Sequence, residues 1–189
     1  MTAKMTIRER MAHEIVDFEA RRDANGNLSV YKLPPGDGGG TFEVAGINDR
    51  YHPQEAAALA KLIKGGFYAQ AELSAARIVA SYTDVVDPWS DAYDIEFYLR
   101  DCCFNRGPKG AARILQRSLG VADDGIVGPK TMKAMYAQVA EDRPALLAKP
   151  RRAREQYERD VVGRNEHNIF WKGLVNRWNN ALTVAQSFR

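Results

Sequence analysis

One segment of turn and strand residues, 23–48, interrupts a chain whose other apolar residues recur at helical steps. Residues 23–27 (DANGN) are typical of a turn, and residues 28–33 (LSVYKL) are typical of a short strand. After the glycine-rich loop PPGDGGG, residues 41–47 (TFEVAGI) alternate again. Elsewhere the spacing predicts helices over residues 7–19, 53–64, 71–83, 91–105, 151–159 and 169–182. The expected fold is therefore mainly α (α+β), with one small β-hairpin.

The first predicted helix has a clear start and ends on a carboxylate. Thr6 and Glu9 form a capping-box pattern, and apolar residues then recur at three- or four-residue steps. At about 100° of rotation per residue, Glu19 lies about 40° from the nearest member of this apolar stripe. A partly buried carboxyl at the negative end of a helix is expected to hold its proton more tightly than a surface glutamate, which suits a general acid. The alternative is a glutamate that reaches solvent from a frayed helix end.

The second predicted strand offers one face for packing and one for a ligand. Phe42 and Val44 point one way, while Thr41, Glu43 and Ala45 point the other way and can line a cleft. The three glycines at 38–40 fit either a sharp bend near a ligand or a flexible solvent loop.

Composition excludes several classes of function. The chain has 189 residues, no apolar run of the roughly 20 residues that span a bilayer, and no signal-peptide pattern at its start, so synthesis in the cytoplasm is expected. The only cysteines, Cys102 and Cys103, are adjacent, which disfavours a disulfide between them and predicts buried thiols. The three histidines show no metal-ligand spacing, and no phosphate-binding loop is present, so neither a metal nor a nucleotide site is expected. A net charge of +3 mildly favours anionic partners such as nucleic acid, acidic lipid or the bacterial cell wall.

Residues 111–139 predict a compact pair of helices. The first helix is expected to end at Gly120, a tight turn follows at Asp124-Gly125, and Gly128-Pro129 starts the second helix. The inward face of the second helix is expected to hold Met132, Met135 and Val139. This stretch resembles the peptidoglycan-binding repeat, whose signature combines Leu-Gln, Leu-Gly, Asp-Gly, Gly and Thr before a helix. The matching residues are Leu115, Gln116, Leu119, Gly120, Asp124, Gly125, Gly128, Pro129 and Thr131.

The order of motifs across most of the chain resembles the glycoside hydrolase family 108 N-acetylmuramidases, often described as secretion-activator-type lysozymes. In that family an N-terminal helix ends in Glu-Gly-Gly-Tyr, followed by Gly-Gly/Thr/Gly-Ile, Asn-x-Gly and Phe-x-x-Gly-Trp-x-x-Arg segments. The corresponding residues here are Glu19, Gly39-Gly40-Thr41, Gly46-Ile47, Asn105-Arg106-Gly107, and Phe170, Gly173 and Arg177. Ala20 and Arg21 stand where the family has two glycines, and the hairpin is longer, as in phage-type lysozymes. The broader lysozyme-like superfamily is therefore the expectation.

The resemblance implies a layout and an activity. Residues 1–108 would form a lysozyme-like catalytic region with an active-site hairpin at 23–48, residues 109–145 a peptidoglycan-binding-type helical repeat, and residues 146–189 C-terminal helices that pack back on the catalytic region. The implied activity is hydrolysis of the β-1,4 bond between N-acetylmuramic acid and N-acetylglucosamine in peptidoglycan glycan strands, with no metal or organic cofactor. The enzyme would act in the periplasm or cell wall after delivery by a phage holin, a secretion apparatus or another non-classical route. An immunity protein is a further candidate partner, and nothing in the sequence requires more than a monomer.

The resemblance also implies roles for particular residues. Glu19 is the expected general acid. Asp37 and Glu43 are alternatives for the second catalytic carboxylate, and Asp37 with Thr41 is preferred because phage-type lysozymes place an acid on a helix opposite an Asp/Thr pair on a hairpin. Saccharide subsites are expected to involve Tyr31, Tyr82, Trp89, Tyr98 and Asn105, although aromatic residues at helical spacing are more often core.

Two other functions stay open at the level of sequence. One is a non-catalytic wall-binding or secretion-assisting protein that uses the repeat alone. The other is nucleic-acid binding, suggested by basic residues between 113 and 154. These basic residues are spread over several predicted elements without a base-reading motif, so a solvated basic face is the preferred interpretation.

Overall fold

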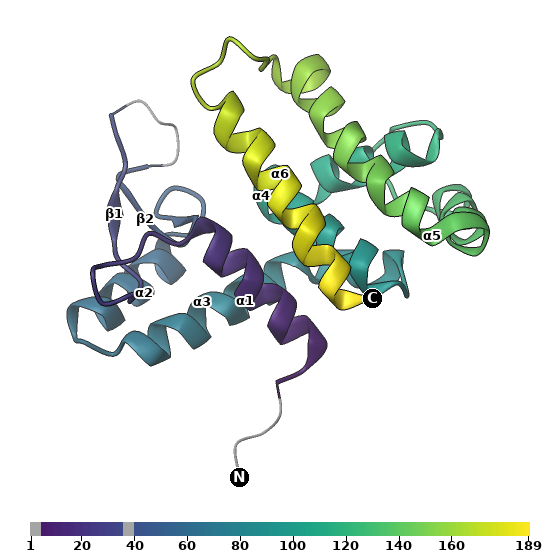
Figure 1. Ribbon diagram of the computed structural model, residues 1–189. Helices are drawn as coiled ribbons and strands as arrows, with labels where there is room; N and C mark the ends of the chain where they lie inside the picture. Colours follow the sequence, from purple (N-terminus) through teal and green to yellow (C-terminus); the bar gives the residue numbers. More distant parts are fainter. Residues whose placement is uncertain (1–4, 36–39) are drawn as a thin grey trace. The chain divides into compact units, whose positions relative to one another are not determined.

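The computed structural model describes residues 5–35 and 40–189 of the chain. Its internal contacts divide the chain into two compact units, Met1–Tyr82 and Thr83–Arg189. Figure 1 shows helices throughout the chain and the short strands of the N-terminal unit. Within the described residues, we find no helix both long and apolar enough to cross a membrane.

The first unit combines three helices with a small sheet. Its elements are α1 (Ile7–Glu19), β1 (Tyr31–Lys32), β2 (Phe42–Val44), β3 (Ile47–Asn48), α2 (Pro53–Lys64) and α3 (Tyr68–Thr83), the last of which runs to the boundary. The core gathers apolar side chains from all of these elements except β1, because each amphipathic helix turns one stripe inward. Its fully or almost fully buried members include Met11, Ile15, Val16, Val44, Ile47, Ala56, Leu59, Ala71, Ala75 and Val79.

The sheet is antiparallel in the order β1-β2-β3. Tyr31 lies opposite Glu43, and Val44 lies opposite Ile47. Between the last pair, Ala45 and Gly46 have φ values of 49° and 76°, the two positive values that a tight type I′ hairpin turn requires. The predicted single strand 41–47 is thus wrong. It is two short strands, and Ala45 is a buried turn residue rather than part of a cleft-facing row.

The second unit is helical. Its elements are η1 (Asp84–Trp89), α4 (Tyr93–Leu119), α5 (Pro129–Tyr157), η2 (Glu158–Val162), α6 (Trp171–Ala185) and η3 (Gln186–Phe188). Figure 1 shows α6 running along α4, and α4, α5 and α6 all contact one another. Trp171 and Trp178 are buried and meet edge to face at 5.5 Å, whereas Phe170 is 54% exposed.

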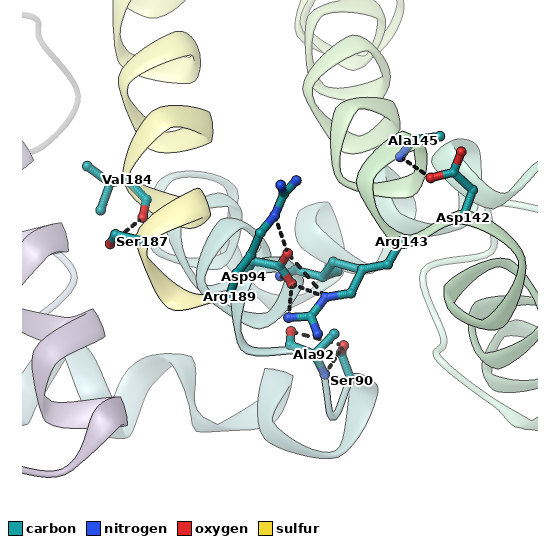
Figure 2. A network of polar contacts seen from close by, with 10 residues as sticks. Ser90, Ala92, Asp94, Asp142, Arg143, Ala145, Val184, Ser187 and Arg189 are labelled. Atoms are coloured by element: carbon teal, nitrogen blue, oxygen red, sulfur yellow. Dashed lines mark hydrogen bonds and ion pairs between the residues drawn. The ribbon is translucent and has the colours of Figure 1, made fainter.

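Two of these helices are kinked at identifiable residues. In α4, Gly107 has φ 69° and ψ 169° just before Pro108, so the predicted helix 91–105 continues across a kink into the repeat. The same helix ends at Gly120 in the left-handed conformation (φ 70°), as predicted. In α5 the break is at Asp142, whose Oδ1 accepts the N–H of Ala145 at 2.9 Å and so caps the helix that resumes (Figure 2).

Buried ion pairs hold the helices of the second unit together. Four fully buried acids, Asp94, Glu96, Asp101 and Glu158, each face at least one arginine. Figure 2 shows one such centre, where Asp94 of α4 accepts from Arg143 of α5 (Nη2–Oδ1 2.7 Å) and from the C-terminal Arg189 (Nε–Oδ2 3.4 Å). Glu96 pairs with Arg100 within α4, whereas the other three acids pair with arginines of other elements. Since a buried charge without a partner costs several kcal/mol, these three sets of pairs fix which helices can neighbour one another.

The two cysteines are free and buried, which confirms the predicted buried thiols. Burial raises the pKa of Cys102 to about 11 and that of Cys103 to about 12. Because the thiolate is the reactive form, we expect neither thiol to react with a disulfide reagent at about pH 8 in the folded protein, and both to react once the chain is unfolded in guanidinium. A stopped-flow titration with such a reagent checks this. Rapid labelling of the folded protein would contradict the burial of the pair.

Candidate functional site

The first helix ends where the sequence predicts, on Glu19. The Thr6 side chain accepts from Glu9 N, and the Glu9 carboxylate accepts from Thr6 N, so the predicted capping box is present at the start. At the other end, Ala20 is extended (φ −67°, ψ 131°) and its N–H reaches the Val16 carbonyl at 2.8 Å. Glu19 is therefore the last helical residue, and its side chain is partly buried.

The chain beyond Glu19 is tied down by Arg22. Its guanidinium pairs with Asp17 of α1 and Glu72 of α3 and donates to the Gly26 carbonyl at 2.9 Å. Asp23 closes the next turn, since its Oδ1 accepts the N–H groups of both Asn25 and Asn27 at 2.9 Å. The exit from α1 is thus set by polar contacts on both sides, which fixes the direction in which the helix ends.

Two contacts of Arg21 join the end of α1 to the chain at the start of the sheet. Arg21 accepts at its carbonyl from Ser29 N (2.9 Å), and its guanidinium lies 5.0 Å from the centre of the Tyr31 ring. Tyr31 is directly opposite Glu43 in the β1–β2 register, so the two side chains share one face of the sheet. The structure therefore brings together two of the predicted site residues, Tyr31 and Glu43. Both are partly buried.

Thr41 is held by a carboxylate that the sequence did not single out, Asp49. Asp49 Oδ1 accepts the N–H of Thr41 at 2.7 Å and that of Phe42 at 3.2 Å, and its Oδ2 accepts the Thr41 hydroxyl. Gly40 lies against the same group, because a Cβ there would come within 2.1 Å of Asp49 Oδ1. The Thr41 hydroxyl, followed by these backbone N–H groups, lowers the pKa of Asp49. With its proton donated to Asp49, the Thr41 oxygen keeps its lone pairs for another donor.

A sequence signal for Asp49 exists in the turn between β2 and β3. A two-residue turn at Ala45-Gly46 pairs Val44 with Ile47, and continuing that register outward brings residue 49 opposite Phe42, next to Thr41. The Asp49 N–H does reach the Phe42 carbonyl at 3.1 Å. Sequence reasoning missed this because it treated residues 41–47 as one strand.

We expect Asp49→Ala to impair any reaction that depends on Thr41 without unfolding the protein. Losing the carboxylate frees the Thr41 hydroxyl to rotate, and we expect a rate loss on the order of 10-fold to 100-fold from misplacement. Steady-state assays on peptidoglycan, with circular dichroism as a fold check, measure this. Asp23→Ala is the matched control, because Asp23 also closes a turn in the same unit but touches neither Thr41 nor β2.

The lowered pKa of Asp49 determines how the Asp49–Thr41 contact responds to acid. Because the folded pKa of Asp49 is lowered, the stabilisation from its hydrogen bonds is fully present above the ordinary aspartate pKa and is lost as pH falls through the lowered value. The Asp49–Thr41 contact is thus intact at neutral and mildly acidic pH.

The remaining predicted site residues fall in different places. Asp37 lies outside the described residues. Tyr82 is partly buried at the end of α3, with its ring edge-on to His52 at 5.4 Å, and both line an open cavity of about 350 Å³ together with Glu55, Arg77, Ile78 and Ser81. Among the residues that the structure covers, no cluster of His, Cys, Asp or Glu is arranged to hold a metal ion.

Three predicted subsite residues belong to the second unit instead, two of them buried and one partly buried. Tyr98 is 0% exposed and Trp89 is 7% exposed, so neither ring offers a face to a sugar. Asn105 uses its Oδ1 to accept from Arg154 Nη2 at 2.6 Å and so belongs to the buried ion-pair network. The two rings were predicted to bind saccharide because sugars stack on aromatic faces, and their interior placement follows the general preference of helical aromatics for the core.

Comparison with known proteins finds a family match for one part of the chain. Residues 110–179 match a family described as Predicted Peptidoglycan domain. The match starts inside the predicted repeat and continues through most of α6. No curated protein matches the chain.

A particular solved structure matches nearly the whole chain. This is "Structure of Brucella abortus SagA", with a TM-score of 0.68 and 20% sequence identity, over 96% of this chain and 94% of that chain. At that identity the likeness shows the fold. The predicted mainly α fold with a small β-hairpin is confirmed.

Proposed function

We propose that the protein is a peptidoglycan hydrolase that cleaves the β-1,4 bond between N-acetylmuramic acid and N-acetylglucosamine. The observation that carries the proposal is the termination of α1 on the partly buried Glu19, tied through Arg21 to the sheet that bears Tyr31, Thr41 and Glu43. The family match over residues 110–179 supports peptidoglycan as the polymer bound. The motif order that resembles the family 108 N-acetylmuramidases supports a glycosidase, as an argument by analogy.

In the proposed mechanism Glu19 is the general acid. Its carboxyl gives a proton to the glycosidic oxygen while the bond from that oxygen to the anomeric carbon breaks, which leaves an oxocarbenium-like sugar. A water molecule then adds to the anomeric carbon and loses its proton to a second carboxylate. Thr41, whose hydroxyl proton is engaged by Asp49, accepts a hydrogen bond from that water and turns a water lone pair toward the sugar.

The second carboxylate is Asp37 or Glu43. We retain Asp37 with Thr41 as the preferred pair, by analogy with phage-type lysozymes, and Glu43 as the alternative on the same sheet face as Tyr31. A separation of roughly 6.5 to 9.5 Å between the two carboxyl groups implies inversion at the anomeric carbon, and about 5.5 Å implies retention. Tyr31 and Tyr82 remain the candidates for saccharide stacking. Such acid-assisted hydrolysis requires neither a metal ion nor an organic cofactor.

The second candidate is a non-catalytic peptidoglycan-binding or secretion-assisting protein. It is favoured by one observation, that the family match lies wholly in the second unit and includes none of the proposed catalytic residues. Incubating the whole protein with purified peptidoglycan separates the two. Hydrolysis releases reducing ends and lowers turbidity, whereas binding alone leaves the protein in the insoluble fraction with no new reducing ends.

The route to the substrate is also part of the proposal. A protein made in the cytoplasm would reach the periplasm or cell wall with a holin, through a secretion apparatus or by another non-classical route, and an immunity protein would then protect the producing cell. Fractionation of the native host with an antibody against this chain tests this expectation.

A further inference from the structure

A positively charged cleft lies in the second unit, which contains none of the proposed catalytic residues. We call it the basic cleft, and its lining residues are Arg117, Ser118, Lys149, Arg152, Ala153 and Gln156. It is open, with a volume of about 410 Å³, and is formed by the end of α4 and the second half of α5. Three of its lining residues are cationic and none is acidic. All of them lie inside the segment that matches the peptidoglycan family.

The matched segment also carries the positive charge of the chain. Residues 110–179 contain 13 Lys and Arg against 8 Asp and Glu, a formal charge of +5, whereas the whole chain has +3. Some of this charge is neutralised internally, because Arg154 and Arg177 pair with the buried Asp101. In the basic cleft, by contrast, two of the three cations have no carboxylate partner among the described residues.

The three cations of the cleft differ in how they are held. Arg117 is fixed by Asp123 (Nε–Oδ2 2.6 Å) and Asp160 (Nη1–Oδ2 3.0 Å), so its side chain is held in place and its charge is largely neutralised. Lys149 donates only to a neutral group, the Gln138 amide oxygen, at 2.6 Å. Arg152 is exposed and forms no ion pair with any residue in the described part of the chain. Lys149 and Arg152 therefore present two positive charges that no carboxylate of the described chain neutralises.

The neutral groups of the cleft indicate what kind of anion fits. Ser118 donates its hydroxyl proton to the Leu115 carbonyl, and Gln156 donates its amide to Asp160 Oδ1, so the Ser118 Oγ and Gln156 Oε1 oxygens are left as acceptors. A ligand matched to this cleft has carboxylates for the cations and N–H groups for the acceptors. The lining includes no aromatic ring on which a sugar could stack.

We propose that the basic cleft binds the peptide stems of peptidoglycan through their free carboxylates and peptide N–H groups. The inference rests on the proposed function only in taking peptidoglycan as the target. In peptidoglycan the lactyl carboxyl of a stem-bearing N-acetylmuramic acid is part of the amide bond to the stem, so the glycan backbone there is uncharged and the stems supply the anionic groups. The cleft would hold the cross-linking peptides while the first unit acts on the glycan.

The test measures binding of a free stem peptide to the full-length protein by isothermal titration calorimetry. The probe is the tetrapeptide L-Ala-D-Glu-diaminopimelate-D-Ala, and its form with every carboxyl amidated serves as the comparison that has no anionic group. Loss of two exposed charge contacts is expected to weaken binding by roughly 10-fold in the double variant Lys149→Gln/Arg152→Gln. The matched control is Lys130→Gln/Lys133→Gln, which removes two exposed charges from the same helix outside the cleft and is expected to bind as the wild type does.

Three results would overturn the inference: equal binding by the two double variants, equal binding of the amidated peptide, or binding of short duplex DNA or inorganic phosphate in preference to the peptide. Because the peptide has no glycosidic bond, its binding is independent of hydrolysis. Peptide binding without any hydrolysis of peptidoglycan would remove the proposed activity and leave the cleft assignment standing. Hydrolysis of peptidoglycan without peptide binding would remove the cleft assignment and leave the proposed activity standing.

Discussion

Glu19→Gln is expected to lower the rate of peptidoglycan clearing by roughly 100-fold to 10,000-fold, the range that a positioned general acid contributes. Glutamine has the size of glutamate and makes similar hydrogen bonds, but it has no acidic proton to give to the leaving oxygen. The variant should still bind peptidoglycan, because the match to the peptidoglycan family lies in the other unit. A turbidity assay with matched protein concentrations measures the rate, and a sedimentation assay measures binding.

The control for this variant is Glu14→Gln. Glu14 lies on the same helix, is also partly buried, and has no part in the proposed mechanism. We expect Glu14→Gln to clear peptidoglycan at the wild-type rate, and both variants to show wild-type circular dichroism. Equal clearing by Glu19→Gln and the wild type would remove Glu19 from its role.

Asp101→Asn is expected to destabilise the fold more than any of the other single substitutions. Asp101 is 0% exposed and accepts from Arg154 (Nη1–Oδ2 2.6 Å) and Arg177 (Nε–Oδ1 3.0 Å), so its neutralisation leaves a buried arginine, Arg154, without its anion. Breaking one partner of a buried pair typically costs about 3 to 5 kcal/mol. For a chain of this length we expect Tm to fall by roughly 6 to 20 °C.

Thermal unfolding followed by calorimetry checks this loss, and Glu166→Gln serves as the surface control. Glu166 also pairs with an arginine, Arg159, but both are at least partly exposed, so the control should lose far less. The double variant Asp101→Asn/Arg154→Met should recover part of the stability, because the fully buried charge of Arg154 is then removed together with its anion. Similar Tm values for Asp101→Asn and Glu166→Gln would contradict the role of the buried pair.

The same pair predicts how stability changes with acid. Burial alone would raise the pKa of Asp101, but Arg177 and Arg154 together lower it below the ordinary aspartate value. Its contribution to the free energy of unfolding is therefore present above an ordinary pKa of about 4 and is lost as pH falls through the lowered value.

Local sequence rules predicted the helix ends well. The capping box at Thr6, the end of α1 at Glu19 and the left-handed Gly120 all depend on residues within one helical turn, and all appear as expected. The kinks at Gly107 and Asp142 were harder to place, because spacing rules divide each of these kinked helices into separate shorter ones. The buried acids were missed for a different reason. Asp94 pairs with Arg189, 95 residues away, and no local pattern reports such a contact.

In the candidate site, too, local sequence rules predicted some features and missed those that depend on strand register or tertiary packing. Glu19 follows from helix periodicity, and the separation of Glu43 from Phe42 and Val44 follows from the alternation of side chains along a strand. Asp49 depends on register, which the turn at Ala45-Gly46 sets, and a one-residue error there moves every side chain to the opposite face. The burial of Tyr98 and Trp89 depends on tertiary packing, which the residue type alone does not determine.

The most direct test of the central claim is to identify the new chain ends made by the wild-type protein. Purified peptidoglycan is digested, the products are reduced with borohydride, and mass spectrometry identifies the reduced sugar. The proposal predicts reduced N-acetylmuramic acid in the wild-type digest and its near absence in the Glu19→Gln digest. Reduced N-acetylglucosamine, or no reduced ends from wild-type protein that binds the polymer, would contradict it.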